Sequence, residues 1–161
     1  MILEVSIELT TNYLGGGPRK NGVRTLRRSP DNRLAINEKE WKEDLKTAAK
    51  ELKIKVDIES ISLEPGLDFP EVNVLRRVYN KTNVDLFEGV SAGNSLSFCM
   101  RVDEDVNGSP TVEEISKLFA VVGKFIGISQ FGKKFHCGRF KVTSVNILGE
   151  EDFNVCKDIL V

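Results

Sequence analysis

The sequence predicts an α+β fold whose elements follow the ferredoxin-like order β-α-β-β-α-β. Three observations support this order: two segments have apolar residues at helical spacing, several others alternate apolar and polar residues, and the two kinds are interleaved. An inserted β-hairpin and a long basic loop after the first strand extend this pattern. With 161 residues, of which 40% are hydrophobic and 29% charged, we expect one globular domain over 1–161.

The first predicted strand covers residues 2–9, where every second position is apolar. It leads into Gly15-Gly16-Gly17 and a basic stretch that extends to residue 34. Six cations in this stretch are opposed only by Asp31: Arg19, Lys20, Arg24, Arg27, Arg28 and Arg33. A loop so long and so one-signed is either functional, for example in phosphate binding, or a flexible solvated connection.

Two helices are predicted, and each begins with a recognisable cap. Asn37 and Glu40 form a variant of the capping box, and apolar residues at helical spacing follow from Trp41 onward. Thr111 and Glu114 form a second such pair before another apolar stripe. Both helices are expected to cover one face of a sheet, which leaves the other face open to a ligand, the hairpin or a second subunit.

The remaining predicted elements are strands. Alternation and turn residues place them at 54–62, 71–79, 83–90, 95–102 and 140–145, with 71–79 and 83–90 paired as the hairpin. Residues 153–160 add an edge strand or a short helix.

The composition indicates neither a membrane protein nor a disulfide scaffold. No apolar run approaches the roughly 20 residues of a membrane span, and the first residues predict a strand instead of a signal peptide. The cysteines are odd in number and widely spaced (Cys99, Cys137 and Cys156), which favours a reducing, cytoplasmic compartment. The net charge of -1 excludes a broadly basic nucleic-acid coat but allows a local phosphate site.

Residues 127–140 form a second basic, glycine-containing segment, which nearly matches a Walker A loop from Gly127 to Lys133. Lys134 replaces the magnesium-binding Ser or Thr, and the segment follows a helix instead of a strand, so we reject nucleoside triphosphate hydrolysis. The glycines still let the backbone approach phosphate closely, with Lys133, Lys134 and Arg139 around them. The alternative is a helix C-cap followed by a wide turn into a strand.

Ile126-Gly127-Ile128 at the end of the second helix, then Gly132, then Gly138-Arg139-Phe140 at the start of the last strand, form a pattern with known counterparts. The pattern resembles the RAMP superfamily (repeat-associated mysterious proteins) of CRISPR systems. It is also similar to small uncharacterised phage and prophage proteins with a C-terminal Ile-Gly…Gly-Arg-Phe motif. Leu34-Ala35-Ile36 is likewise similar to the segment where such proteins enter their first helix.

The resemblance implies a ferredoxin-like fold with the glycine loop after its second helix. It implies that Gly127, Gly132 and Gly138 shape the loop and that Arg139 is the polar anchor, unless Arg139 pairs with a carboxylate on the sheet. The sequence departs from the family at Ser129, where many members have another glycine. A phage-encoded protein of this kind would act in the host cytoplasm.

His136, the single histidine, is the weak catalytic candidate. Some RAMP endoribonucleases use histidine as a general base without a metal, and an ordinary histidine pKa suits that chemistry. Catalysis would need a partner such as Tyr13 or Lys133 within hydrogen-bonding reach; otherwise His136 is a surface residue. One histidine and three scattered cysteines give no zinc spacing, so we predict no metal and no cofactor.

Three functional hypotheses follow. The first is a non-enzymatic, phage-type accessory protein that binds nucleic acid or a nucleotide through both basic segments, in host-defence evasion. Its phosphate-binding candidates are Arg19, Lys20, Arg24, Arg27, Arg28, Lys133, Lys134 and Arg139, and its loop-shaping glycines are Gly15, Gly16, Gly17, Gly127, Gly132 and Gly138. The second is a metal-independent endoribonuclease with His136 as base. The third is a structural protein that forms homo-oligomers or joins a host or phage protein complex.

Overall fold

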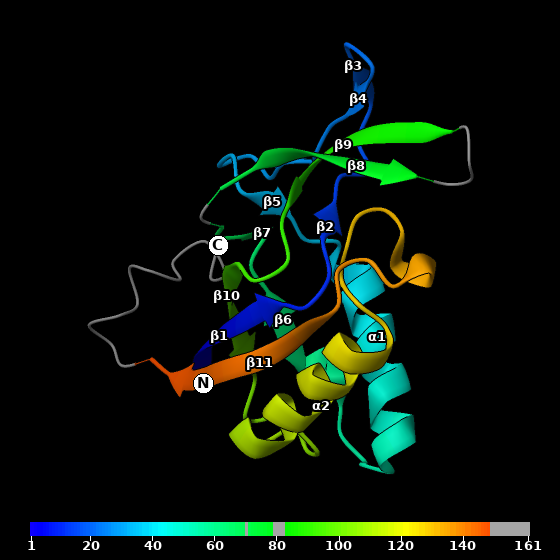
Figure 1. The fold of residues 1–161 in the computed structure, drawn as a ribbon. Coiled ribbons are helices and arrows are strands. Elements are labelled where there is room, and N and C mark those ends of the chain that lie inside the picture. Colours follow the sequence, from blue (N-terminus) through cyan, green and yellow to red (C-terminus); the bar gives the residue numbers. More distant parts are fainter. Residues whose placement is uncertain (70, 79–82, 149–161) are drawn as a thin grey trace.

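The computed structural model describes residues 1–69, 71–78 and 83–148 (Figure 1). Its helices are α1 (Glu38–Leu52) and α2 (Val112–Phe125), with 3-10 turns η1 (Ile58–Ser60) and η2 (Lys133–Phe135). Its strands are β1 (Ile2–Leu9), β2 (Tyr13–Leu14), β3 (Arg19–Lys20), β4 (Val23–Arg24), β5 (Leu34–Ala35), β6 (Ile61–Leu63), β7 (Gly66–Leu67), β8 (Asn73–Val78), β9 (Val84–Val90), β10 (Ser95–Val102) and β11 (Phe140–Ile147). The element predicted at 153–160 lies outside the described residues.

The main sheet has four strands in the order β11-β1-β10-β6, and every neighbouring pair is antiparallel. This is the order that a β-α-β-β-α-β chain produces when each helix returns across the same face. Both helices lie side by side on one face of the sheet, as predicted (Figure 1). The predicted ferredoxin-like α+β fold is therefore confirmed. No helix in the described part of the chain is long and apolar enough to cross a membrane.

The core lies between this sheet and the two helices. Burial alternates along β1 as the sequence pattern predicts, with Leu3, Val5 and Ile7 fully buried. The Trp41 ring on α1 meets the Phe98 ring at 5.1 Å and the Phe119 ring at 6.4 Å, both edge to face. These aromatic contacts join α1 to α2 and to the sheet.

Both predicted helix caps are present. The Asn37 side chain accepts a hydrogen bond from the Glu40 amide at 3.1 Å. Thr111 and Glu114 form a reciprocal capping box, with distances of 3.2 Å from the Glu114 amide to the Thr111 hydroxyl and 3.0 Å from the Thr111 amide to the Glu114 carboxylate. Each cap satisfies amides that the first helical turn leaves without an internal partner.

The strand predicted over 54–62 is wrong for most of its length, since β6 covers only the three residues from Ile61. The chain leaves α1 through Lys53, whose φ of 55° is left-handed, and the following residues form no ladder with another strand. Asp57 then caps η1 through its side chain. Alternating Ile and Val residues therefore produce an extended connection there instead of a sheet strand.

The basic stretch is folded. It contributes the short strands β2, β3 and β4 to a second, five-stranded sheet built around β9, and β5 pairs with β7. The predicted hairpin forms from β8 and β9, with residues 73–78 antiparallel to 84–89. This second sheet stands above the main one, and the β3–β4 hairpin projects from its far end (Figure 1).

Candidate nucleic-acid interface

The two basic segments, far apart in the sequence, lie side by side. Leu14 and Phe131 form an isolated antiparallel bridge, in which the Phe131 amide donates to the Leu14 carbonyl at 3.2 Å. The Ser129 hydroxyl accepts from the Leu14 amide at 2.6 Å and donates to the Leu14 carbonyl at 3.0 Å. Ser129 is 3% exposed, so these bonds are shielded from water. The serine that departs from the RAMP pattern therefore joins the two segments.

Gln130 forms a second link between the segments. Its side-chain oxygen accepts from the Arg27 amide at 2.7 Å and from the Gly16 amide at 3.4 Å, and its nitrogen donates to the Arg27 carbonyl at 2.8 Å. A glutamine that pairs with both backbone groups of one residue fixes that residue's position and orientation. Arg27 is thus held beside the glycine loop.

The glycines permit this close approach. A Cβ on Gly16 would lie 2.5 Å from the Gln130 carbonyl oxygen, and one on Gly138 would clash with the Ser129 amide. Gly138 also has a φ of 70°, which favours glycine. The other loop glycines are similarly placed: Gly15 and Gly17 face Thr25, and Gly127 and Gly132 have φ values of 89° and 82°.

Phe131 lies at the centre of the junction. Its ring contacts the Phe87 ring of β9 at 4.8 Å, the Arg24 guanidinium of β4 at 5.1 Å and the Arg77 guanidinium of β8 at 5.8 Å. Contacts of this kind hold cations over an aromatic face without neutralising them. The Arg24 Nε is buried and forms no hydrogen bond with any described residue. Through these contacts, Phe131 of the glycine loop packs against both β4 and the β8–β9 hairpin.

Phe135 is the exposed aromatic residue of this surface. Arg77 lies over its ring at 4.3 Å and Lys134 at 5.3 Å, while 48% of the residue stays exposed. Tyr13, named above as a possible partner of His136, is 1% exposed, and burial raises the pKa of its phenol. Tyr13 is therefore a core residue, and Phe135 is the side chain able to stack on a ligand.

Two of the predicted phosphate-binding cations are already paired. Arg19 holds Asp85 of β9 through two hydrogen bonds of 3.0 and 3.1 Å. The Lys133 ammonium lies 3.0 Å from a Glu40 oxygen and 2.6 Å from an Asp44 oxygen on α1. Their charges are largely neutralised, and both side chains tie loops to the body of the protein.

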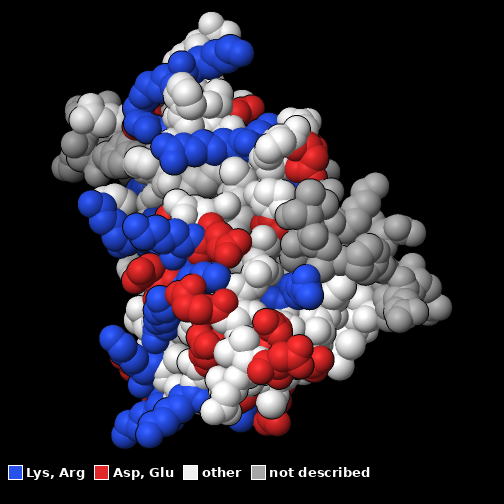
Figure 2. All heavy atoms as spheres, turned by 180° about the vertical axis from the view of Figure 1, so that it is seen from behind, with Lys and Arg blue, Asp and Glu red and all other residues white. Residues whose placement is uncertain are grey.

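Other predicted cations stay available. Lys20, Arg27 and Lys134 are exposed and form no ion pair with the residues that the structure describes. Arg28 is also exposed, with its guanidinium 5.4 Å from the Phe69 ring centre. On the rear face of the molecule, Lys and Arg side chains gather at the β3–β4 tip and along one margin, while acidic side chains lie in patches between and below (Figure 2).

Arg139 and His136 lie next to each other at the end of the loop. An Arg139 nitrogen is 3.1 Å from the His136 Nδ1, and another donates to the Lys124 carbonyl at the end of α2. Arg139 therefore closes the helix end, and its Nε is buried without a hydrogen bond among the described residues. His136 is exposed, with a left-handed φ of 68°. The His136 amide donates to the Lys133 carbonyl at 3.1 Å, but the Lys133 ammonium is held by Glu40 and Asp44, and the Tyr13 side chain is buried in the core. Neither expected catalytic side chain is therefore placed against the His136 ring.

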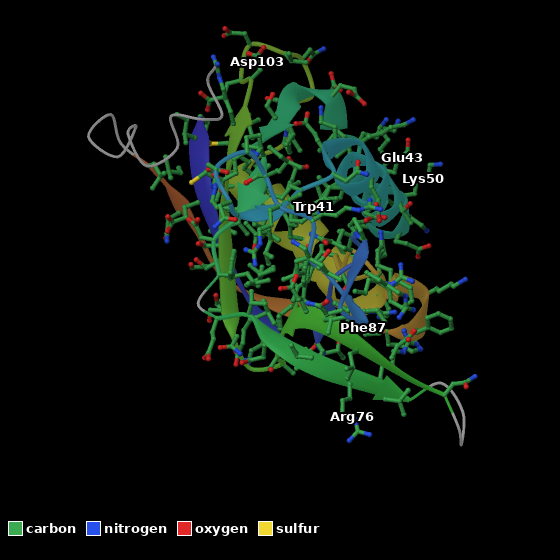
Figure 3. All side chains as sticks on the ribbon, turned by 90° about the horizontal axis from the view of Figure 1, so that it is seen from above. Trp41, Glu43, Lys50, Arg76, Phe87 and Asp103 are labelled. Atoms are coloured by element: carbon green, nitrogen blue, oxygen red, sulfur yellow. The ribbon has the colours of Figure 1, made fainter. Side chains whose placement is uncertain are left out.

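The structure adds site residues that the sequence did not single out. Arg76 and Arg77 project from opposite faces of β8, because neighbouring strand residues alternate. Arg77 lies over Phe131 and Phe135, whereas Arg76 points away from the body of the protein (Figure 3). The adjacent arginines in the predicted hairpin were the sequence feature that could have identified these two site residues. No local pattern indicated that Gln130 would bind Arg27.

A buried ion pair fixes the far end of the basic stretch. Arg33 contacts Glu64, which is 2% exposed, and also lies 2.6 Å from Asp31. Glu64 additionally accepts from the Cys99 amide of β10. Burial raises the pKa of the Glu64 carboxyl, although Arg33 and the Cys99 amide oppose the shift. This contact anchors the stretch to the main sheet.

Two cysteines bear on the earlier expectations. Cys99 on β10 is 4% exposed, as is typical of a small buried residue. Cys137 is a free thiol whose pKa is raised by burial. Within the described residues, no group of three or more His, Cys, Asp or Glu side chains is placed to hold a metal ion.

Comparison with known proteins identifies similar folds and no family. No known protein family and no curated protein matches the sequence. Among solved structures, a chain of the type III-B CRISPR Cmr-β complex bound to cognate target RNA has a TM-score of 0.54 and 14% identity, covering 91% of this chain. This chain spans 60% of that one. A chain of a type IV-B CRISPR complex has a TM-score of 0.54 and 12% identity, covering 93% of each chain. These likenesses concern the fold alone and agree with the ferredoxin-like α+β arrangement described above.

Proposed function

We propose that the protein binds single-stranded nucleic acid, with RNA as the preferred class, on the surface where the two basic segments meet. The observation that carries this proposal is the double link through Ser129 and Gln130, which places Arg27 and Gly16 against the glycine loop. Cations from two sequence regions thereby lie around one junction.

The available side chains suit a phosphate backbone. Arg27 and Arg24 offer planar donor groups that can hold two phosphate oxygens, and Lys20 and Lys134 offer mobile point charges. The whole chain has a net charge of -1, so attraction to a polyanion must arise locally at this surface. Binding should therefore be strongly salt-dependent and largely independent of base sequence.

Phe135 favours a single strand over a duplex. Its half-exposed ring can stack on an unpaired base, with the Arg77 and Lys134 cations beside it. Two similar solved structures belong to CRISPR complexes, one of them described as bound to cognate target RNA. That description supports RNA as the first ligand to test.

We further propose that binding occurs without cleavage. An RNA-cleaving site needs a base with an acid or cationic partner aimed at the same phosphate. Among the described residues, the His136 ring hydrogen-bonds with Arg139, and Arg139 is engaged with the end of α2. A phage-type accessory role, in which such a binder blocks a nucleic-acid-guided complex of the host, extends this proposal.

The test is a titration of labelled single-stranded RNA, single-stranded DNA, double-stranded RNA and cyclic oligonucleotides, at about 50 and 200 mM salt. We expect tightest binding to single-stranded RNA and a loss of about tenfold or more at the higher salt. Arg27→Gln with Lys134→Gln should weaken binding about tenfold, whereas the control pair Lys50→Gln with Lys55→Gln, near the C-terminal end of α1, should not. Absence of binding to every probe, or equal effects of both pairs, would contradict the proposal; cleaved RNA after incubation would restore the nuclease hypothesis.

A further inference from the structure

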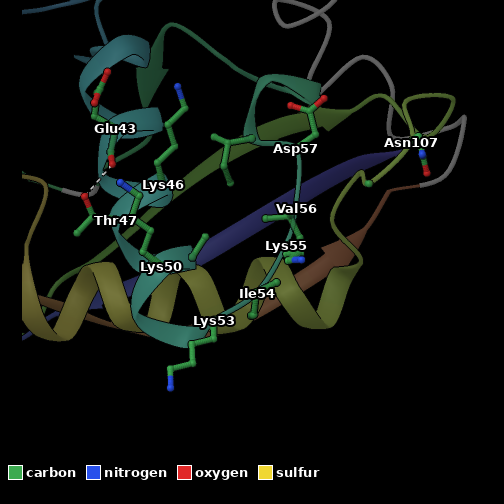
Figure 4. A pocket seen from close by; sticks show the side chains of 13 residues that line it. Glu43, Lys46, Thr47, Lys50, Lys53, Ile54, Lys55, Val56, Asp57 and Asn107 are labelled. Atoms are coloured by element: carbon green, nitrogen blue, oxygen red, sulfur yellow. Dashed lines mark hydrogen bonds between the residues drawn. The ribbon is translucent and has the colours of Figure 1, made fainter.

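A hollow of about 760 Å³ lies at the C-terminal end of α1 (Figure 4). This end of the helix is away from the β8–β9 hairpin and the glycine loop (Figure 1). Its walls are the outer face of α1, the extended connection after that helix and the turn at Asn107-Gly108. Aliphatic groups form its floor: Ala49 is buried, and Ile54 and Val56 are half-buried.

The rim of the hollow is rich in lysine. Lys46, Lys50, Lys53 and Lys55 line it, against the carboxylates of Glu43 and Asp57. Lys46 is paired with Glu59 at 2.9 Å. The other three lysines are exposed and make no ion pair with any part of the chain that the structure describes. The hollow therefore presents unneutralised positive charge around an apolar floor.

The connection along one wall has free backbone groups. The Ile54 amide donates to the Ala49 carbonyl at 3.0 Å, and the Asp57 amide donates to the Gly108 carbonyl at 2.7 Å. Between these two bonds, the amides of Lys55 and Val56 and the carbonyls of residues 54–56 have no hydrogen-bond partner among the described residues. An extended segment that is fixed at both ends and unpaired in the middle can accept a further strand.

We propose that this hollow binds an extended, acidic peptide segment of a protein partner, which pairs with the backbone of residues 54–56. Alternate side chains of such a peptide would point to the aliphatic floor and to the lysine rim. A nucleic acid fits the hollow less well, because neither arginine nor an aromatic residue lines it and two carboxylates do. The site lies at the opposite end of α1 from the Lys133 contacts, so it is independent of the proposed nucleic-acid surface.

The experiment measures the fluorescence anisotropy of a labelled short peptide of alternating Glu and Val. We expect saturable binding that Lys50→Glu with Lys55→Glu weakens by about tenfold or more, and that the matched pair Lys20→Glu with Lys134→Glu leaves unchanged. Lys53 is kept, because its left-handed backbone makes substitution there ambiguous. The milder pair Lys50→Gln with Lys55→Gln serves if charge reversal unfolds the protein.

Two control peptides separate the contributions to binding. Methylation of alternate backbone nitrogens in the peptide should abolish binding, since it removes the donors needed for strand pairing. Replacing Val by Ser should weaken binding through loss of contact with the floor. Absence of saturable binding, full affinity of the methylated peptide, or equal affinity of the Lys50/Lys55 variant would overturn the proposal. Displacement of the peptide by an unlabelled RNA oligonucleotide would also overturn it, in favour of a general polyanion site.

Discussion

Replacement of Ser129 by Ala tests whether the link between the two basic segments is structural. The Ser129 hydroxyl is the hydrogen-bond partner of the Leu14 amide, and both residues are buried at 3% exposure. The Leu14 carbonyl retains the Phe131 amide as a donor. The substitution therefore leaves one buried donor, the Leu14 amide, without a hydrogen-bond partner and leaves no acceptor without one. A buried donor without a partner costs about 1–3 kcal/mol, and we expect the free energy of unfolding to fall by that amount.

Urea unfolding followed by tryptophan fluorescence measures this change, because Trp41 is the single tryptophan and lies in the core. Ser95→Ala, at the exposed first residue of β10, is the matched control and should change the free energy by less than about 0.5 kcal/mol. Amide hydrogen exchange at Leu14 should accelerate in Ser129→Ala alone. A fall in unfolding free energy below about 0.5 kcal/mol, with unchanged exchange at Leu14, would refute the reasoning.

Four further predictions concern stability. Arg33→Met leaves the buried Glu64 carboxylate without its cation and should cost about 3–5 kcal/mol in urea unfolding, with partial recovery when Glu64→Gln is added. Because burial raises the pKa of Glu64, the folded chain holds the Glu64 proton more tightly than the unfolded chain does. The free energy of unfolding should therefore decrease as the pH rises from the ordinary glutamate pKa through the raised one, and it should decrease less in Glu64→Gln. Identical pH profiles of the two proteins would contradict this prediction. Gly138→Ala should lower the melting temperature more than Gly93→Ala, since both have positive φ but only Gly138 is crowded; equal losses would count against this. Thr111→Ala should cost about 1 kcal/mol through loss of the α2 cap, measured by urea unfolding, and no change would show the cap to be energetically neutral.

Elements with a sustained periodic pattern could be predicted from the sequence. The strands at 2–9 and 95–102 and both helices carry several apolar repeats each, and their burial follows those repeats. The region after α1 shows the limit of this reasoning. Ile54, Val56 and Ile58 alternate like a strand, yet the left-handed turn at Lys53 directs the chain along the helix instead of into the sheet.

The site could be predicted only in part. Its two segments were visible as local runs of cations and glycines, but strands of two residues, such as β3 and β4, have no periodic signal. Long-range contacts also changed the roles of individual cations. Lys133 pairs with carboxylates on α1 that are 89 and 93 positions away, and a local charge count cannot reveal such a pairing.

The most direct test of the central claim follows backbone amide shifts by NMR while a short single-stranded RNA is added. The account predicts that amides near Lys20 and Arg27 in the first segment, and near Lys134 and Phe135 in the second, shift together and fit one dissociation constant. Shifts confined to one segment, different constants for the two segments, or shifts centred on the α1 lysines would contradict a joint surface.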